Sequence, residues 1–320
     1  MQITQQGKRK RYLVFFSILT VLVAAALVLR QFELNTPKLP IGLGIEVALD
    51  WSIIYLSPIL ETMKLSVSQV FKVIETAFLW LPWPVWIVLV GLAGWRSASR
   101  GTALALMGAL LTIQAVGLWD EAMSTVALVT TALILTVLVA IPIGIVAARN
   151  DLVEKIVRPL LDAMQTIPSL TYLIPVVMLL GVGKVPAVIA TMVFAIPPAI
   201  RLTNLGLRQV SATVKEAAIA FGASGWQLLM KVEIPLALRT IMAGINQSTM
   251  MAVSMVIIAA FIGAGGLGYS VLFALNRIQI GPGFEAALAI LAIAIVLDRL
   301  TQSLAKPKET GRVRPSSEAE

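Results

Sequence analysis

Two side chains that carry much of protein chemistry are missing from this chain, which has no cysteine and no histidine. Their absence excludes disulfide bonds, thiol nucleophiles, imidazole bases and the usual zinc ligands. Charged residues are also scarce, at 13% of the 320 residues, whereas soluble domains carry about 25%. A catalytic site would have to rely on carboxylates, lysines or hydroxyls, and we predict neither a catalytic nor a metal-binding site.

Hydrophobic residues, by contrast, make up 58% of the chain. They fall in runs of about 16 to 27 residues, long enough to cross a hydrocarbon layer about 30 Å thick. The sequence therefore predicts an all-α membrane protein in a lipid bilayer. We expect about eight transmembrane helices, over residues 12–30, 80–96, 101–119, 123–148, 166–183, 185–200, 240–263 and 284–303.

The basic residues indicate how these helices are oriented. Residues 8–11 are all Lys or Arg and precede the first apolar run, and basic residues favour alternate connecting segments by about three to one. Because cytoplasmic segments collect Lys and Arg, both termini should be cytoplasmic. The net charge of +8 then reports topology, and no nucleic acid partner is expected. We interpret residues 1–30 as a basic N-terminus and a retained anchor; a cleaved secretory signal is the alternative.

Residues 31–79 form a predicted outer segment between the first two apolar runs. From Ile53 to Phe78, apolar residues recur every three or four positions, with Ser, Glu and Lys on the other face. This pattern predicts an amphipathic helix lying in the membrane interface. A dimer brace or a receptor contact are the alternatives. Two transmembrane helices should follow within 80–119, and the polar residues 304–320 should be a disordered cytoplasmic tail.

Two nucleotide-binding patterns fail on inspection. Residues 263–268 fit G-x-G-x-x-G, but that motif needs a preceding strand, and here a long apolar helix is predicted. We expect these glycines to end the seventh helix as a flexible, closely packed turn. The phosphate-loop pattern G-x-x-x-x-G-K-[ST] is also absent from the sequence. If ATP drives this protein, another subunit must bind it.

The longest predicted inner loop, residues 201–239, carries the functional argument. An apolar stripe predicts a first short helix that stops at Gly222, a suitable left-handed cap. Ser224 and Gln227 have the spacing of a capping box, which begins a second helix, and Pro235 interrupts the pattern that follows. Two short helices joined by a glycine turn would make a stiff projection from the membrane.

The same loop resembles a known family. It fits E-A-A-x3-G-x9-I-x-L-P, the signature of permease subunits of ATP-binding cassette importers, with Val and Ile in place of Ile and Leu. Residues 162–175, 189–191, 194–203, 205–209 and 243–268 look like the glycine betaine, choline and proline-betaine uptake permeases of that family. The resemblance covers about residues 120–300, and the anchor at 12–30 departs from it. The residues that match the coupling signature are Glu216, Ala217, Ala218, Gly222, Val232, Ile234 and Pro235.

The resemblance implies a type I importer permease core over 120–303, whose cytoplasmic coupling loop, 201–239, sits in a cleft of the ATPase. It also implies a second permease chain in a homodimer, two ATPase subunits that bind ATP and Mg, an extracytoplasmic substrate-binding protein and the bacterial inner membrane. This chain would bind no cofactor itself. Transport would follow alternating access by rigid-body movement, with Glu216 as a polar anchor to the ATPase and Gly222 setting the turn.

The solute is less constrained by the sequence. The resemblance implies an osmoprotectant such as glycine betaine or choline, and a quaternary ammonium favours aromatic faces. Trimethylamine N-oxide, a sulfonium osmolyte and taurine remain open, as do a stand-alone secondary carrier and a membrane-embedded enzyme. Scarce charge within the spans argues against the carrier, and the missing His and Cys against the enzyme. The candidate path residues, each also explained by packing or interface anchoring, are Trp119, Tyr172, Phe194, Phe261 and Tyr269.

Overall fold

The computed structural model describes residues 15–28, 40–97 and 99–305. The basic residues 8–11 and nearly all of the predicted tail lie outside these ranges. The chain divides into two units, residues 1–50 and 51–320, which are described separately. The described part of the first unit holds an apolar helix, Phe15–Val28, and the beginning of α2 (Ile41–Trp80).

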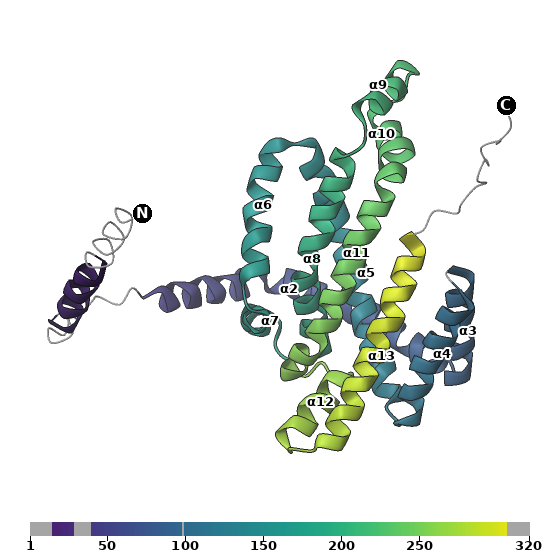
Figure 1. Cartoon of the computed structure of the whole chain (residues 1–320), viewed down its shortest axis with the longest axis horizontal. Coiled ribbons are helices and arrows are strands. Elements are labelled where there is room, and N and C mark those ends of the chain that lie inside the picture. Colours follow the sequence, from purple (N-terminus) through teal and green to yellow (C-terminus); the bar gives the residue numbers. More distant parts are fainter. Residues whose placement is uncertain (1–14, 29–39, 98, 306–320) are drawn as a thin grey trace, which may run out of the picture. The chain divides into compact units, whose positions relative to one another are not determined.

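The second unit is helical throughout its described residues apart from short turns, as the sequence predicted. After α2 the helices follow one another in the order of Figure 1: α3 (Trp83–Ser97), α4 (Arg100–Ala115), α5 (Trp119–Arg149), α6 (Asp151–Thr166), α7 (Leu173–Leu180), α8 (Lys184–Arg208), α9 (Ala212–Ala220), α10 (Gly225–Leu228), α11 (Ile234–Ala259), α12 (Gly266–Asn276) and α13 (Ile280–Ala305).

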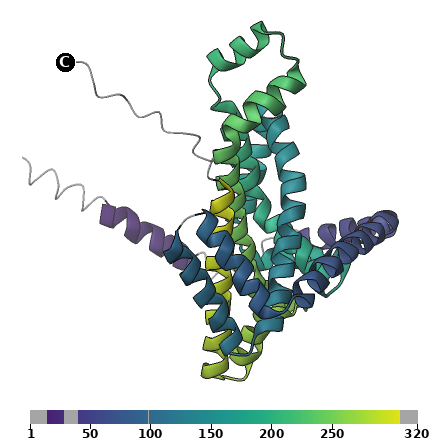
Figure 2. The ribbon, with the colours of Figure 1, turned by 90° about the vertical axis from the view of Figure 1, so that its right-hand side faces the viewer.

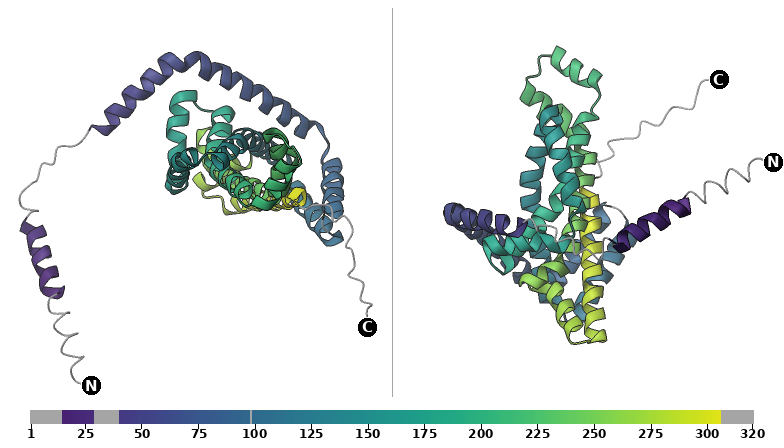
Figure 3. Two further views of the ribbon diagram at one scale, coloured as in Figure 1. Left: turned by 90° about the horizontal axis from the view of Figure 1, so that it is seen from above. Right: turned by 90° about the vertical axis from the view of Figure 1, so that its left-hand side faces the viewer.

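The centre of this unit is formed by α5, α8 and α11, which pack along one another (Figure 3). Of the candidate membrane spans, α8 buries the largest share of its apolar window. Many of the fully buried positions in these helices are alanines, such as Ala132, Ala190 and Ala252. Small side chains let helix backbones approach closely, which is how membrane helices gain contact when lipid is as apolar as they are.

Gly144 shows how tightly α5 and α8 cross. A Cβ atom added there would lie 2.6 Å from the Cβ of Thr203 and 3.1 Å from the carbonyl oxygen of Ile200. Carbon atoms at optimal contact are about 3.5–4.0 Å apart. The crossing of α5 and α8 therefore requires glycine at this position.

The predicted fifth span corresponds to part of a broken helix. α6 begins at Asp151, well before the predicted boundary at 166, and meets the Ser169–Leu180 segment at a bend of 112°. The break falls at Ile167, which is extended, and Pro168. A proline disfavours helical geometry in the residue before it, which explains this position. The sixth span, predicted to end at 200, is longer, because α8 continues through Pro197 and Pro198 to Arg208.

Each of the eight predicted segments contains helix, but they differ in length. Among the described residues, five helices are long and apolar enough to cross a membrane, or six if the bent α6–α7 pair is one span. The predicted spans at 12–30, 80–96 and 101–119 correspond to the shorter helices Phe15–Val28, α3 and α4. α2 satisfies the same length and hydropathy test, although its sequence predicted an interfacial helix.

From Trp51 onward, α2 runs beside the bundle (Figure 3) and uses its predicted apolar stripe to contact protein. Val67 belongs to the stripe and is buried together with Phe71 against residues of α5, α7 and α8. Ile74 and Phe78 pack against the same cluster. The interfacial interpretation therefore missed this packing.

The first half of the glycine-rich stretch, 263–265, forms a turn after a helix, as expected, and 266–268 are the first residues of α12. Gly263 adopts left-handed geometry with φ of 84° after α11, and α12 begins at Gly266. The hydroxyl of Thr125 on α5 accepts a hydrogen bond from the Leu267 N–H at 2.8 Å. This tight contact holds the start of α12 against α5, and α12 itself was not predicted from the sequence.

Candidate functional site

The segment between α8 and α11 projects beyond the long helices (Figure 2). We call residues 209–233 the knob; it contains α9, α10 and a five-residue π-helix, Leu229–Glu233. The sequence predicted one continuous first helix from about 201. Instead α8 ends at Arg208, a turn follows, and α9 begins at Ala212.

The turn between α9 and α10 has the predicted geometry. Gly222 has φ of 82°, the left-handed conformation that glycine adopts without steric penalty. The Ala223 N–H donates to the Ala218 carbonyl at 3.0 Å and closes the end of α9. Ser224 and Gln227 form the predicted capping box, since each side chain accepts a hydrogen bond from the other residue's backbone N–H. These local bonds make the turn a defined structure.

Large apolar side chains cover the tip of the knob. Phe221 is 94% exposed and Trp226 is 69% exposed, and Ile219 is exposed beside them. Neither α9 nor α10 has a buried residue. Exposed aromatic residues at the end of a projection are typical of a protein contact, because their burial in a partner contributes most of the energy of many interfaces.

The seven residues of the predicted coupling signature fall in two places. We call α9 and the turn that follows it the arm of the knob. The arm carries Glu216, which is exposed, together with Ala217, Ala218 and Gly222. Val232, Ile234 and Pro235 lie at the base, where the knob joins α11. The signature therefore spans the connection between the tip and a long helix, and does not form one surface patch.

The base of the knob contains the π-helix. The Ile234 N–H donates to the carbonyl of Leu229, five residues earlier, which is the wider π pattern. Pro235 follows at the start of α11 and has no N–H to give to an α-helical bond. The proline thus coincides with a change in hydrogen-bond pattern, and the helical path continues through it into α11 without a break.

The sequence did not predict the ionic cluster beside the π-helix, which forms around one buried carboxylate. The Glu233 side chain is only 9% exposed, and its two oxygens meet Arg149 of α5 at 2.8 Å and Lys215 of α9 at 3.3 Å. The Arg149 guanidinium also lies 3.5 Å from the Gly225 carbonyl. The only signal in the sequence was an acidic residue within a predominantly basic loop, which does not specify its partners.

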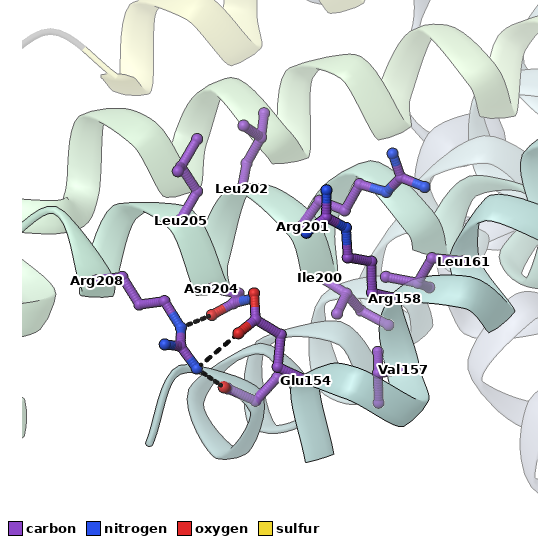
Figure 4. Close-up of a pocket in the computed structure, with 11 residues that line it drawn as sticks. Glu154, Val157, Arg158, Leu161, Ile200, Arg201, Leu202, Asn204, Leu205 and Arg208 are labelled. Atoms are coloured by element: carbon purple, nitrogen blue, oxygen red, sulfur yellow. Dashed lines mark hydrogen bonds and ion pairs between the residues drawn. The ribbon is translucent and has the colours of Figure 1, made fainter. Parts of the chain in front are cut away.

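A polar cavity of about 380 Å³ lies between α6 and α8 (Figure 4). Arg208 contacts Asp151 at 2.8 Å and Glu154 at 3.0 Å, and Arg201 pairs with Asp162. Arg158 also lines this cavity. Most of the charges neutralise one another, so the cavity walls are held together by ion pairs between the two helices.

The five predicted path residues are not gathered into one site. Tyr172 and Phe194 meet edge to face with ring centroids 5.7 Å apart, and the Tyr172 hydroxyl donates to the Met164 carbonyl. Phe261 and Tyr269 are both more than half exposed, and Trp119 packs in a separate apolar cluster. The ring contacts of the described residues join neither Tyr172 nor Phe194 to the other three.

The chain matches one protein family and several named transport permeases. The family described as "Binding-protein-dependent transport system inner membrane component" matches residues 140–308. The glycine betaine/proline betaine transport system permease protein ProW of Escherichia coli is 43% identical over 268 residues, which is 84% of this chain and 76% of that protein. The glycine betaine transport system permease protein OpuAB of Bacillus subtilis is 40% identical, covering 86% of this chain and 97% of its own.

Two further likenesses are more partial. The trimethylamine N-oxide transport system permease protein TmoV of Pelagibacter ubique is 41% identical over 69% of this chain, and that match covers 31% of TmoV. A solved structure of the MetNI methionine ABC transporter, in an inward-facing conformation, matches 57% of this chain and 91% of its own with a TM-score of 0.53. At 18% identity this last likeness concerns the fold alone.

Proposed function

The chain belongs to the family of binding-protein-dependent transport system inner membrane components, and on that premise we propose how it couples ATP hydrolysis to solute import. It is a membrane permease of an ATP-binding cassette importer for betaine-type solutes. It is not the catalytic subunit, because in these systems the ATPase is a separate chain.

The knob is the observation that carries the proposed coupling role. It projects from the central helices, exposes Phe221 and Trp226 at its tip, and is braced at its base by the Glu233 cluster. A stiff projection can transmit a push because it does not absorb the force by bending. We propose that the knob docks in the ATPase, that Glu216 adds a polar contact there, and that Gly222 shapes the turn.

The proposed cycle is alternating access. ATP and Mg bind to the two ATPase subunits, which close and draw the knobs of two permease copies together. The long helices follow as rigid bodies and open toward the outer side, where an extracytoplasmic binding protein delivers its solute. In this proposal the knob and both termini lie in the cytoplasm, and the protein lies in a bacterial inner membrane. The bias of basic residues agrees with this orientation.

Glycine betaine is the solute that we propose first, because two relatives that each match more than four fifths of this chain are named for it. The TmoV likeness favours trimethylamine N-oxide as the second candidate. Both are small, methylated and without net charge. Tyr172 and Phe194 are the aromatic pair that we propose beside the path, since their rings already lie together.

The proposal is tested by producing the tagged full-length chain together with the ATPase and the binding protein encoded beside it, and purifying the chain through its tag. We expect the ATPase to co-purify, and a deletion of residues 216–235 to release it while the permease stays in the membrane. In proteoliposomes, uptake of glycine betaine should require ATP and the binding protein. Uptake by this chain without any ATPase would show a secondary carrier, and preferential uptake of trimethylamine N-oxide would select the second solute.

A further inference from the structure

Few side chains hold the knob to the long helices, and they lie at its base. α9 contributes no buried residue, and neither does α10. The apolar cluster beneath the knob has buried residues from α8, α11 and the base of the knob, where Val210 and Leu229 contribute, and Ile141, Ile145 and Ala148 of α5 pack against it. The projecting arm itself therefore has little apolar packing through which to transmit a movement.

Glu233 connects elements that the chain path does not connect directly. Its carboxylate meets Arg149, the last residue of α5, and Lys215, which lies on α9. The Lys215 ammonium also donates to the Leu207 carbonyl of α8 at 3.2 Å. One buried carboxylate thus joins the arm of the knob to the ends of α5 and α8, while the backbone attaches the knob to α8 and α11 alone.

Burial makes this cluster stiff. A charged group removed from water is tolerated when it is paired, and Glu233 has two cations facing two oxygens. If the arm moved away from α5, the carboxylate would lose one partner while it stayed shielded from water. That penalty opposes independent movement, so α9 and α5 should move together.

We infer that Glu233 is a positioning residue that passes movement of the knob to α5, so that α5, α8 and α11 reorient as one body. The inference rests on the proposed coupling role of the knob. It adds Glu233, which stands at the unspecified position between Val232 and Ile234 of the coupling signature. Glu233 touches neither solute nor nucleotide in this role. Its contribution appears in how much solute crosses for each ATP consumed.

The decisive measurement is the ratio of solute transported to ATP hydrolysed, in proteoliposomes that contain the whole transporter with its binding protein. We expect E233Q to keep the ATPase bound and hydrolysing while this ratio falls tenfold or more. E233D, which retains the charge, should recover most of the ratio. A loss caused only by poor folding would lower the amount of complex and would leave the ratio of the remaining complex unchanged.

K215Q provides a second, milder test, because Lys215 is partly exposed and its replacement should not prevent folding. We expect the ratio to fall at least threefold. K155Q is the matched control: Lys155 is an exposed lysine of α6, outside the knob, and the ion pairs of the described residues do not include it. Its ratio should equal that of the wild type.

The outcomes separate this inference from the function on which it rests. If the wild-type chain neither binds an ATPase nor transports with ATP, the proposed function fails. If the wild type couples normally and both E233Q and K215Q keep its transport-to-ATP ratio, the function stands and the role of Glu233 is overturned. A fall of the ratio in K155Q equal to that in K215Q would also overturn it.

Discussion

The ammonium of Lys184 lies 2.5 Å from a carboxylate oxygen of Glu75, which joins the beginning of α8 to α2. Ser124 on α5 donates to the same oxygen at 2.5 Å, and the Lys184 ammonium lies 5.3 Å from the centre of the Phe71 ring. The sequence placed Glu75 on the polar face of an interfacial helix. In the structure that polar residue instead anchors α2 to two helices of the core.

Replacing Glu75 should therefore loosen the attachment of α2. We expect E75A to lower the free energy of unfolding by about 1–3 kcal/mol, because Lys184 and Ser124 lose a charged acceptor. Thermal unfolding of the purified protein in detergent measures this change. E61A is the control, since Glu61 is an exposed residue of the same helix that makes no ion pair among the described residues. Equal effects of the two substitutions would contradict the anchoring role.

The exposed aromatic residues at the tip of the knob give a second prediction, which concerns binding. F221A should weaken the affinity for the ATPase tenfold or more, since a buried aromatic anchor at an interface contributes about 2 kcal/mol or more. The stability of the isolated permease should not change, because Phe221 is 94% exposed. Titration of the ATPase against immobilised permease measures the affinity.

A matched control for this substitution lies far from the knob in sequence. Trp95 is an exposed aromatic residue of α3, at 55%. W95A should leave ATPase affinity unchanged. If F221A and W95A bind the ATPase as tightly as the wild type, the tip of the knob is not the docking surface.

The helices and the knob's turn could be predicted because their signals are local. Apolar runs marked the long helices, Gly222 marked a left-handed cap, and Ser224 with Gln227 marked a capping box. Each depends on residues within a few positions of one another. Hydrogen bonds of this kind form wherever the local chain allows them, whatever lies around it.

The ionic clusters could not be predicted, because their partners are far apart in the chain. Glu233 and Arg149 are 84 positions apart, and Lys184 and Glu75 are 109 apart. Their pairing depends on how whole helices pack. The start of the fifth span was misplaced for the same reason. The polar residues at the start of α6 lay outside the predicted spans, because the sequence does not show that their partner is on α8.

Gly222 gives a third prediction, which concerns backbone conformation. A side chain added there meets no atom within 4 Å, but φ is 82°. G222V should abolish uptake while the protein remains in the membrane, because a left-handed β-branched residue is strained by about 1–3 kcal/mol and the turn would change shape. G222N should retain more uptake, since asparagine tolerates this conformation. Uptake of labelled solute by whole cells measures both.

Gly225 is the matched control for that substitution. It lies three positions away, is also exposed, and has open space around its Cβ position, but its φ is not positive. G225A should therefore support normal uptake. If G222V also transports normally, the shape of the turn does not matter for coupling.

The crossing of α5 and α8 at Gly144 gives the last prediction, which concerns packing. G144A should lower the free energy of unfolding by about 1–3 kcal/mol, because the added methyl group overpacks a site where Thr203 stands 2.6 Å away. G108A is the control: that glycine of α4 has nothing within 4 Å, so alanine should be neutral or stabilise the helix by up to about 1 kcal/mol.

A double-mutant cycle separates overpacking from any other effect of G144A. T203G removes the side chain that the new methyl group would meet, at its own loss of helix stability. When G144A is added to T203G, we expect a smaller loss of stability than G144A causes alone, since the Thr203 side chain is gone and the close contact that remains is the one to the Ile200 carbonyl oxygen at 3.1 Å. Thermal unfolding of the four proteins in detergent completes the cycle. If G144A is as destabilising with T203G as without it, the close approach of the two helices does not depend on this pair.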